Sequence, residues 1–147
     1  MAELKHQAKE HSLTFFMKTA RLTSSAPVLL VREVVAAANY YRDMLGFTYD
    51  RFWGEPPDFV ILRRDGLHLM LSVAPTGSSI TPNWKVNGIW NVYFWVDDVD
   101  SLFEEFKKSG AKIDYNLEDK PYNVREFGIR DLDDYDIGFG QPMAPNA

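Results

Sequence analysis

The chain has 147 residues, of which 46% are hydrophobic, 14% aromatic and 25% charged, the size and composition of one globular domain. It contains no cysteine, which excludes a disulfide scaffold, a thiolate zinc site and a cysteine nucleophile. Its 16 basic and 21 acidic residues give a net charge of -5, so a nucleic-acid partner is not expected and a cationic small molecule fits better. No stretch has the roughly 18 apolar residues of a membrane-spanning helix, and the N-terminal residues are charged and polar. We therefore expect a cytoplasmic protein with no membrane partner.

The first 25 residues differ from the rest. They mix charges with one apolar cluster over 13–17 and end in a polar Thr-Ser-Ser run. We expect residues 1–25 to form an arm, either flexible or a short helix, and residues 26–147 to form a single domain.

The first half of this domain, about residues 27–74, has the pattern of a βαβββ module. A β-branched run over 28–31 predicts a buried strand, and apolar residues spaced by three or four over 34–45 predict a helix that ends at Gly46. Strands are then predicted over 47–53, 59–63 and 67–73, with Asp65 and Gly66 in the hairpin turn.

The same pattern returns after a connection over 74–89 that is rich in Pro, Gly, Ser and Asn. Residues 90–141 predict a strand over 90–96, a helix from 99 to Gly110, and strands over 112–117, 124–130 and 136–139. The halves superpose at nearly constant offsets: Glu33 on Asp98, Gly46 on Gly110, and Phe59, Ile61 and Asp65 on Phe127, Ile129 and Asp133. We therefore predict an α+β fold in which two tandem βαβββ modules form an open, curved mixed sheet shaped as a cup.

Three segments carry a family resemblance: REVVAAANYYRDMLGF at 32–47, NVYFWVDDVDSLFEEFKKSGAKI at 91–113 and VREFGIRDLDDYDIGF at 124–139. They resemble the vicinal oxygen chelate superfamily, which includes glyoxalase I, extradiol dioxygenases and bleomycin resistance proteins. The match looks closest to the bleomycin resistance proteins. That resemblance implies a non-catalytic homodimer that sequesters a small molecule in crevices at or near the subunit interface.

The resemblance also implies where a metal would be held. The four ligand positions of the superfamily enzymes fall on Ala26, Met70, Asn91 and Gly138, and none of these is a strong metal ligand. We therefore expect no metal, no cofactor and no catalytic residue. The alternative is a metal-dependent lyase or isomerase of glyoxalase type that uses a shifted site around His68 and Asp136.

The resemblance places Met70, Asn91 and Gly138 in the cup. Strand alternation adds His68, Tyr93, Trp95 and Asp136, because side chains two apart share a face, and Trp53, in a turn, is expected to close over the mouth. An aromatic wall with a few polar groups suits an aromatic or cationic ligand, for example a glycopeptide antibiotic. A third interpretation is a structural or regulatory module whose own aromatic residues fill the cup. The predicted site comprises Trp53, His68, Met70, Asn91, Tyr93, Trp95, Asp136 and Gly138.

Overall fold

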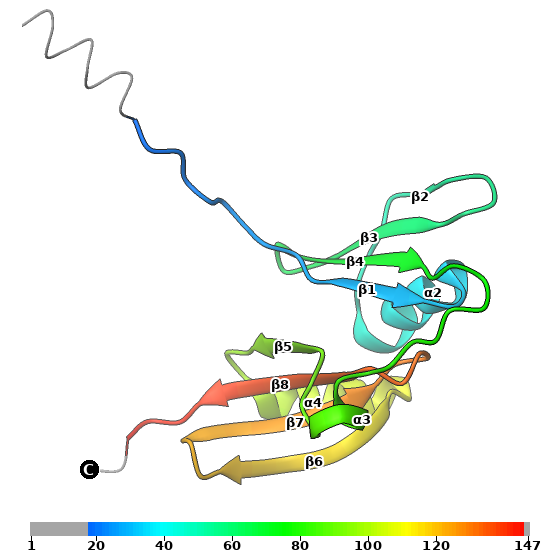
Figure 1. Ribbon diagram of the computed structural model, residues 1–147. Coiled ribbons are helices and arrows are strands. Elements are labelled where there is room, and N and C mark those ends of the chain that lie inside the picture. The colour runs from blue at the N-terminus through cyan, green and yellow to red at the C-terminus, as the bar shows by residue number, and fades with distance from the viewer. Residues whose placement is uncertain (1–17, 146–147) are drawn as a thin grey trace, which may run out of the picture.

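A computed structural model describes residues 18–145, which form two four-stranded sheets with one long helix packed on each. The first sheet, sheet 1, and its helix are built from consecutive elements: β1 (Val28–Val31), α2 (Val34–Leu45), β2 (Phe52–Trp53), β3 (Phe59–Arg64) and β4 (Leu67–Val73). Residues 18–27 precede these elements without helix or strand and lead away from the sheets (Figure 1). The first 17 residues of the expected arm lie outside the described part.

Sheet 2 repeats this order after a connection that contains the short helix α3 (Trp84–Asn87). Its elements are β5 (Val92–Trp95), α4 (Val99–Ser109), β6 (Lys112–Lys120), β7 (Val124–Arg130) and β8 (Asp136–Pro142). The α+β fold with two βαβββ modules is confirmed.

Both sheets have the same topology, β1-β4-β3-β2 and β5-β8-β7-β6. In each, the first strand runs parallel to the last one and the remaining pairs are antiparallel. Strand pairing does not join the two sheets, which lie one above the other in Figure 1.

The helix ends match the internal repeat. Glu33 and Asp98 are the N-cap residues of α2 and α4, and Asp98 accepts a hydrogen bond from the Ser101 backbone N–H at 3.1 Å. Gly46 and Gly110 end the two helices with φ angles of 72° and 89°, a left-handed conformation that glycine adopts without steric cost.

One part of the predicted superposition is wrong by a residue. Phe127 packs in the core, whereas Phe59 is only partly buried and Val60, beside it, is fully buried. Val60 is therefore the equivalent of Phe127, because a slip of one residue along a strand moves a side chain to the opposite face.

Several element boundaries also differ from the prediction. The strand expected over 47–53 is reduced to β2, because Thr48 makes only an isolated bridge to Arg63. The connection expected to lack regular structure contains α3. β6 and β8 extend beyond their predicted ends because each pairs with β7 over a longer register.

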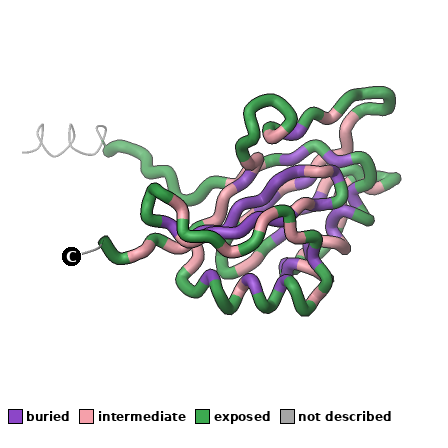
Figure 2. Tube along the Cα trace, turned by 90° about the horizontal axis from the view of Figure 1, so that it is seen from below, coloured by how far each residue is buried: buried purple, intermediate pink, exposed green. Residues whose placement is uncertain are grey.

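The core lies where the two modules meet through their helices. α2 contacts α4, and side chains on the helix-facing sides of both sheets form one cluster. Buried segments run through the centre of the molecule in Figure 2. Polar contacts join the modules as well: Ser109 Oγ donates to the Met44 carbonyl at 2.6 Å, and Arg64 pairs with Glu105 at 2.7 Å.

The opposite side of each sheet points away from this core, and we call it the open face. On β1, Leu29 and Val31 are buried, whereas Val28 and Leu30 on the open face are 56% and 47% exposed. Among the described residues, no helix is long and apolar enough to cross a membrane.

Candidate ligand-binding site

The predicted site residues fall on two different sheets. Trp53, His68 and Met70 belong to sheet 1, and the other five belong to sheet 2 or immediately precede it. Asp136 and Gly138 lie on β8, Tyr93 and Trp95 lie on β5, and Asn91 comes directly before β5.

On sheet 1 the predicted residues are partly buried. Met70 pairs with Val28 on one side and Ile61 on the other, and His68 pairs with Arg63. The Trp53 ring packs edge-on against Phe59 at 5.6 Å and lies 4.4 Å from the Arg51 guanidinium. These residues give sheet 1 an apolar open face with a few polar groups.

On sheet 2, an aromatic row of Trp90, Tyr93 and Trp95 crosses the open face. The ring centroids of Trp90 and Tyr93 are 4.5 Å apart, and those of Tyr93 and Trp95 are 5.0 Å apart. Trp95, at the end of the row, is 62% exposed. An aromatic ring this exposed beside two others is a surface suited to ligand stacking.

Glycines under the row let its rings lie close to the sheet. A Cβ at Gly138 would come within 2.6 Å of Tyr93 Cδ2 and 2.8 Å of Trp90 Cδ1. A Cβ at Gly140 would overlap the Tyr93 hydroxyl. Gly138 thus contributes to the site by lacking a side chain, which is a common reason for glycine within a strand.

Beneath these rings lies Glu126, a residue that sequence reasoning did not select. Its side chain is buried and accepts hydrogen bonds from Tyr93 at 3.4 Å, Tyr115 at 2.5 Å and Tyr122. Trp90 Nε1 in turn donates to the Tyr115 hydroxyl at 2.8 Å. One sequence signal was present: Glu126 is an acidic residue two positions before Gly128 on a strand that is otherwise largely apolar.

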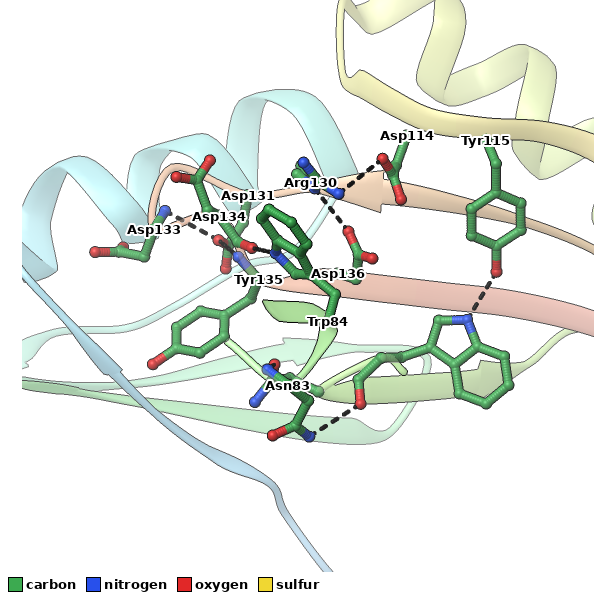
Figure 3. A network of polar contacts seen from close by, with 12 residues as sticks. Asn83, Trp84, Asp114, Tyr115, Arg130, Asp131, Asp133, Asp134, Tyr135 and Asp136 are labelled. Carbon is green, nitrogen blue, oxygen red and sulfur yellow. Dashed lines mark hydrogen bonds and ion pairs between the residues drawn. The ribbon is translucent and has the colours of Figure 1, made fainter. Parts of the chain in front are cut away.

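Asp136 is engaged by a network at one end of the open face (Figure 3). Arg130 Nε lies 2.9 Å from Asp136, its Nη2 lies 3.1 Å from Asp114, and the Trp84 ring stacks 3.9 Å from its guanidinium. Burial raises the pKa of Asp136 above its ordinary value, and the Arg130 hydrogen bond opposes that shift. The network fixes α3 against β7.

The Asn91 side chain is also engaged, in a hydrogen bond with the segment that connects the two sheets. Its side-chain oxygen accepts a hydrogen bond from the Asn83 backbone N–H at 2.8 Å. The Asn83 amide donates to the Trp90 carbonyl at 3.1 Å. Asn91 therefore holds the segment that precedes the aromatic row.

The residues present do not fit the superfamily's metal centre. Ala26, Met70 and Gly138 have no ligand group of the required kind, and the Asn91 oxygen already accepts a hydrogen bond. The shifted pair does not fit either, because one His and one Asp fall short of a ligand set and Asp136 is paired with Arg130. Within residues 18–145, no group of three or more His, Cys, Asp or Glu side chains is arranged to hold a metal ion.

A cleft of about 520 Å³ lies between the β3–β4 hairpin, the end of β5 and the first half of α4. Its apolar lining includes Phe47, Phe94 and Phe106, and its polar lining includes Arg64 and Glu105. Of the predicted site residues, Trp95 alone lines it. Trp95, the last residue of the aromatic row, therefore also borders the cleft.

The repeated topology agrees with a family model that matches most of the chain. Residues 23–139 match the Glyoxalase/Bleomycin resistance protein/Dioxygenase superfamily. The chain belongs to this superfamily. A search of curated proteins returned no match.

Solved structures show the same superfamily fold at low sequence identity. The bleomycin-binding protein from bleomycin-producing Streptomyces verticillus, complexed with copper(II)-bleomycin, is 23% identical with a TM-score of 0.62, covering 86% of this chain and 99% of its own. TnmS3, an antibiotic binding protein from Streptomyces sp. CB03234, is 18% identical with a TM-score of 0.64, covering 85% and 99%. Lactoylglutathione lyase from Agrobacterium tumefaciens is 20% identical with a TM-score of 0.62, covering 84% and 96%.

Proposed function

We propose that this superfamily member is a non-catalytic binding protein that sequesters an aromatic or cationic small molecule, such as a glycopeptide antibiotic. The observation that carries the proposal is the aromatic row on the open face of sheet 2, which ends in the exposed Trp95. Rings held at fixed spacing on a sheet bind a flat ligand with little loss of conformational entropy. Two structures of similar fold are named for antibiotic binding, which supports the same ligand class.

Replacing Trp95 with alanine tests this site. We expect about tenfold or greater loss of affinity for a stacked aromatic ligand, because exposed tryptophans at binding sites often dominate the binding energy. Calorimetric titration with metal-free bleomycin as the first probe measures the change. Val86→Ala on α3, another exposed apolar residue, serves as the control and leaves affinity unchanged. Equal affinity in Trp95→Ala and wild type would place the ligand elsewhere.

The second element of the proposal is a homodimer, in which a partner covers the apolar open face of sheet 1. Val28 and Leu30 are large apolar residues that β1 leaves exposed, and contiguous exposed apolar surface is typical of an interface. A crevice between this face and the partner's sheet 2 would enclose the ligand.

Light scattering tests the homodimer. We expect a dimer for the wild type and a folded monomer for Leu30→Glu, because an unpaired charge is costly in an apolar interface. Val35→Glu is the matched control, since Val35 is also exposed but lies on α2, and it stays dimeric. A wild-type monomer with intact fold would contradict the dimer.

The glyoxalase-type alternative is not favoured, because the residues at the superfamily's metal positions are not ligands. Elemental analysis of protein purified without chelator checks this point, and stoichiometric bound metal would restore the enzyme interpretation. We also propose the cytoplasm as the site of action, which cell fractionation tests.

A further inference from the structure

Glu126 is a buried carboxylate whose partners are phenols. Its side chain is 1% exposed, and three tyrosine hydroxyls converge on its two oxygens. Glu126 is the acceptor in all three hydrogen bonds, and each phenol is the donor. The nearby cations pair with other acids: Lys120 with Glu118, and Arg125 with Asp100 and Asp119.

The three phenols are held as donors. Burial raises the pKa of Tyr93 and Tyr115, and burial followed by the Glu126 hydrogen bond raises the pKa of Tyr122 to about 12. Each hydroxyl therefore keeps its proton and points it at the carboxylate. A phenol that donates to an anion gains electron density, which strengthens the attraction of its ring face for a cation.

The Tyr93 ring brings this effect to the aromatic row of sheet 2. Tyr93 joins the carboxylate below to the exposed Trp95 ring, 5.0 Å away. One ring of the cluster already has a cation, because Lys120 Nζ lies 5.1 Å from the Tyr115 centroid. Trp95, beside Tyr93, is 62% exposed, so a ligand can supply a second cation at this end of the row.

We propose that buried Glu126 makes the aromatic row selective for a planar organic cation over a neutral ring of the same shape. The inference rests on the proposed function, because it needs the ligand to lie on this face. Glu126 acts as a positioning residue: it fixes and polarises the rings, and the rings contact the ligand.

Two probes of matched shape test the selectivity: N-methylquinolinium, a permanent cation, and 2-methylquinoline, which is neutral at mildly alkaline pH. Calorimetric titration of the full-length protein gives both affinities. We expect the wild type to bind the cation about tenfold more tightly than the neutral ring, the size of a partly desolvated cation–π contact. In Glu126→Gln the ratio falls to about twofold or less, while affinity for the neutral probe changes little.

Two further variants keep the test decisive if Glu126→Gln does not fold. Tyr93→Phe keeps the ring but removes the hydroxyl that joins the aromatic row to Glu126, so it lowers the ratio while the carboxylate stays in place. Glu104→Gln, on the exposed side of α4, removes the same charge from a remote position and leaves the ratio unchanged.

The outcomes separate the two proposals. If the wild type binds both probes equally, or if Glu126→Gln and Tyr93→Phe keep the wild-type ratio, the role of Glu126 is overturned and the binding function stands. If neither probe binds the wild type, the selectivity is overturned, and the binding function on this face fails as well only if metal-free bleomycin also does not bind. A ratio lost in both variants and kept in Glu104→Gln supports the inference.

Discussion

Replacing Gly140 with alanine is expected to destabilise the domain by about 1–3 kcal/mol, the usual range for an overpacked site, and to weaken ligand binding. The new methyl group would overlap the Tyr93 hydroxyl and lie 2.7 Å from Val124 Cγ1. Tyr93 must then leave its position, which breaks its hydrogen bond to Glu126 and displaces the neighbouring Trp95. Chemical denaturation measures the first effect, and calorimetric titration with N-methylquinolinium measures the second.

A double variant identifies the cause. Removing the Tyr93 hydroxyl in Gly140→Ala/Tyr93→Phe relieves the closest overlap, so part of the lost stability returns while Val124 still limits the recovery. Strictly additive effects of the two substitutions would show that the Tyr93 ring does not rest on Gly140.

The second large effect is a pH dependence centred on Asp131 in the β7–β8 turn. This carboxylate accepts hydrogen bonds from Tyr41 Oη at 2.7 Å and from the backbone N–H groups of Asp133 and Tyr135. Burial outweighs these bonds and raises the pKa of Asp131 to about 6. An aspartate in the unfolded chain has a pKa of about 3.9. Between these two pKa values the folded state therefore binds more protons than the unfolded state.

Asp131 therefore stabilises the fold more at low pH. Compared with neutral pH, protonation of Asp131 adds to the free energy of unfolding. This added stability is fully present below about pH 4 and is lost as the pH rises through about 6. The two-unit difference corresponds to about 3 kcal/mol. Other acids titrate over the same range, so the test is the difference between wild type and Asp131→Asn in denaturation curves from acid to neutral pH.

In Asp131→Asn the amide oxygen retains the two backbone hydrogen bonds, and the contribution of this site no longer depends on pH. Stability of the variant relative to wild type then rises with pH across this window. Glu104→Gln, an exposed substitution of equal charge, gives no such trend. Parallel curves for Asp131→Asn and wild type would mean that Asp131 titrates normally in the folded protein.

Much of the fold follows from local sequence signals. Apolar spacing gives α2 and α4, Gly46 and Gly110 end them, and the repetition of this pattern implies two similar modules. Alternation also places Met70, Tyr93 and Trp95 on open faces, because strand periodicity depends only on neighbouring residues.

The buried part of the site depends on contacts that strand alternation cannot predict. Ile113 packs against the core, and Tyr115, two residues later, should share its face. A register shift between them instead pairs Tyr115 with Gly128 and brings its hydroxyl to Glu126. Such a bulge is set by the pairing of β6 with β7, so the tyrosine cluster around Glu126 cannot be found from either strand alone.

The same limitation applies to the acidic end of the open face. Asp136 was predicted as a ligand-binding residue from its position on the last strand. Its pairing with Arg130 is set by the register of β7 with β8. The stacking of Trp84 on that arginine requires α3 to fold back from a connection that was expected to lack regular structure.

The most direct test of the binding function is calorimetric titration of wild type and Trp95→Ala with three ligands: metal-free bleomycin, N-methylquinolinium and 2-methylquinoline. The proposed function predicts saturable binding of at least one of them at about one ligand per chain, with affinity reduced about tenfold or more by Trp95→Ala. No saturable binding to any of the three, or binding that the substitution leaves unchanged, would contradict a ligand site on the open face of sheet 2.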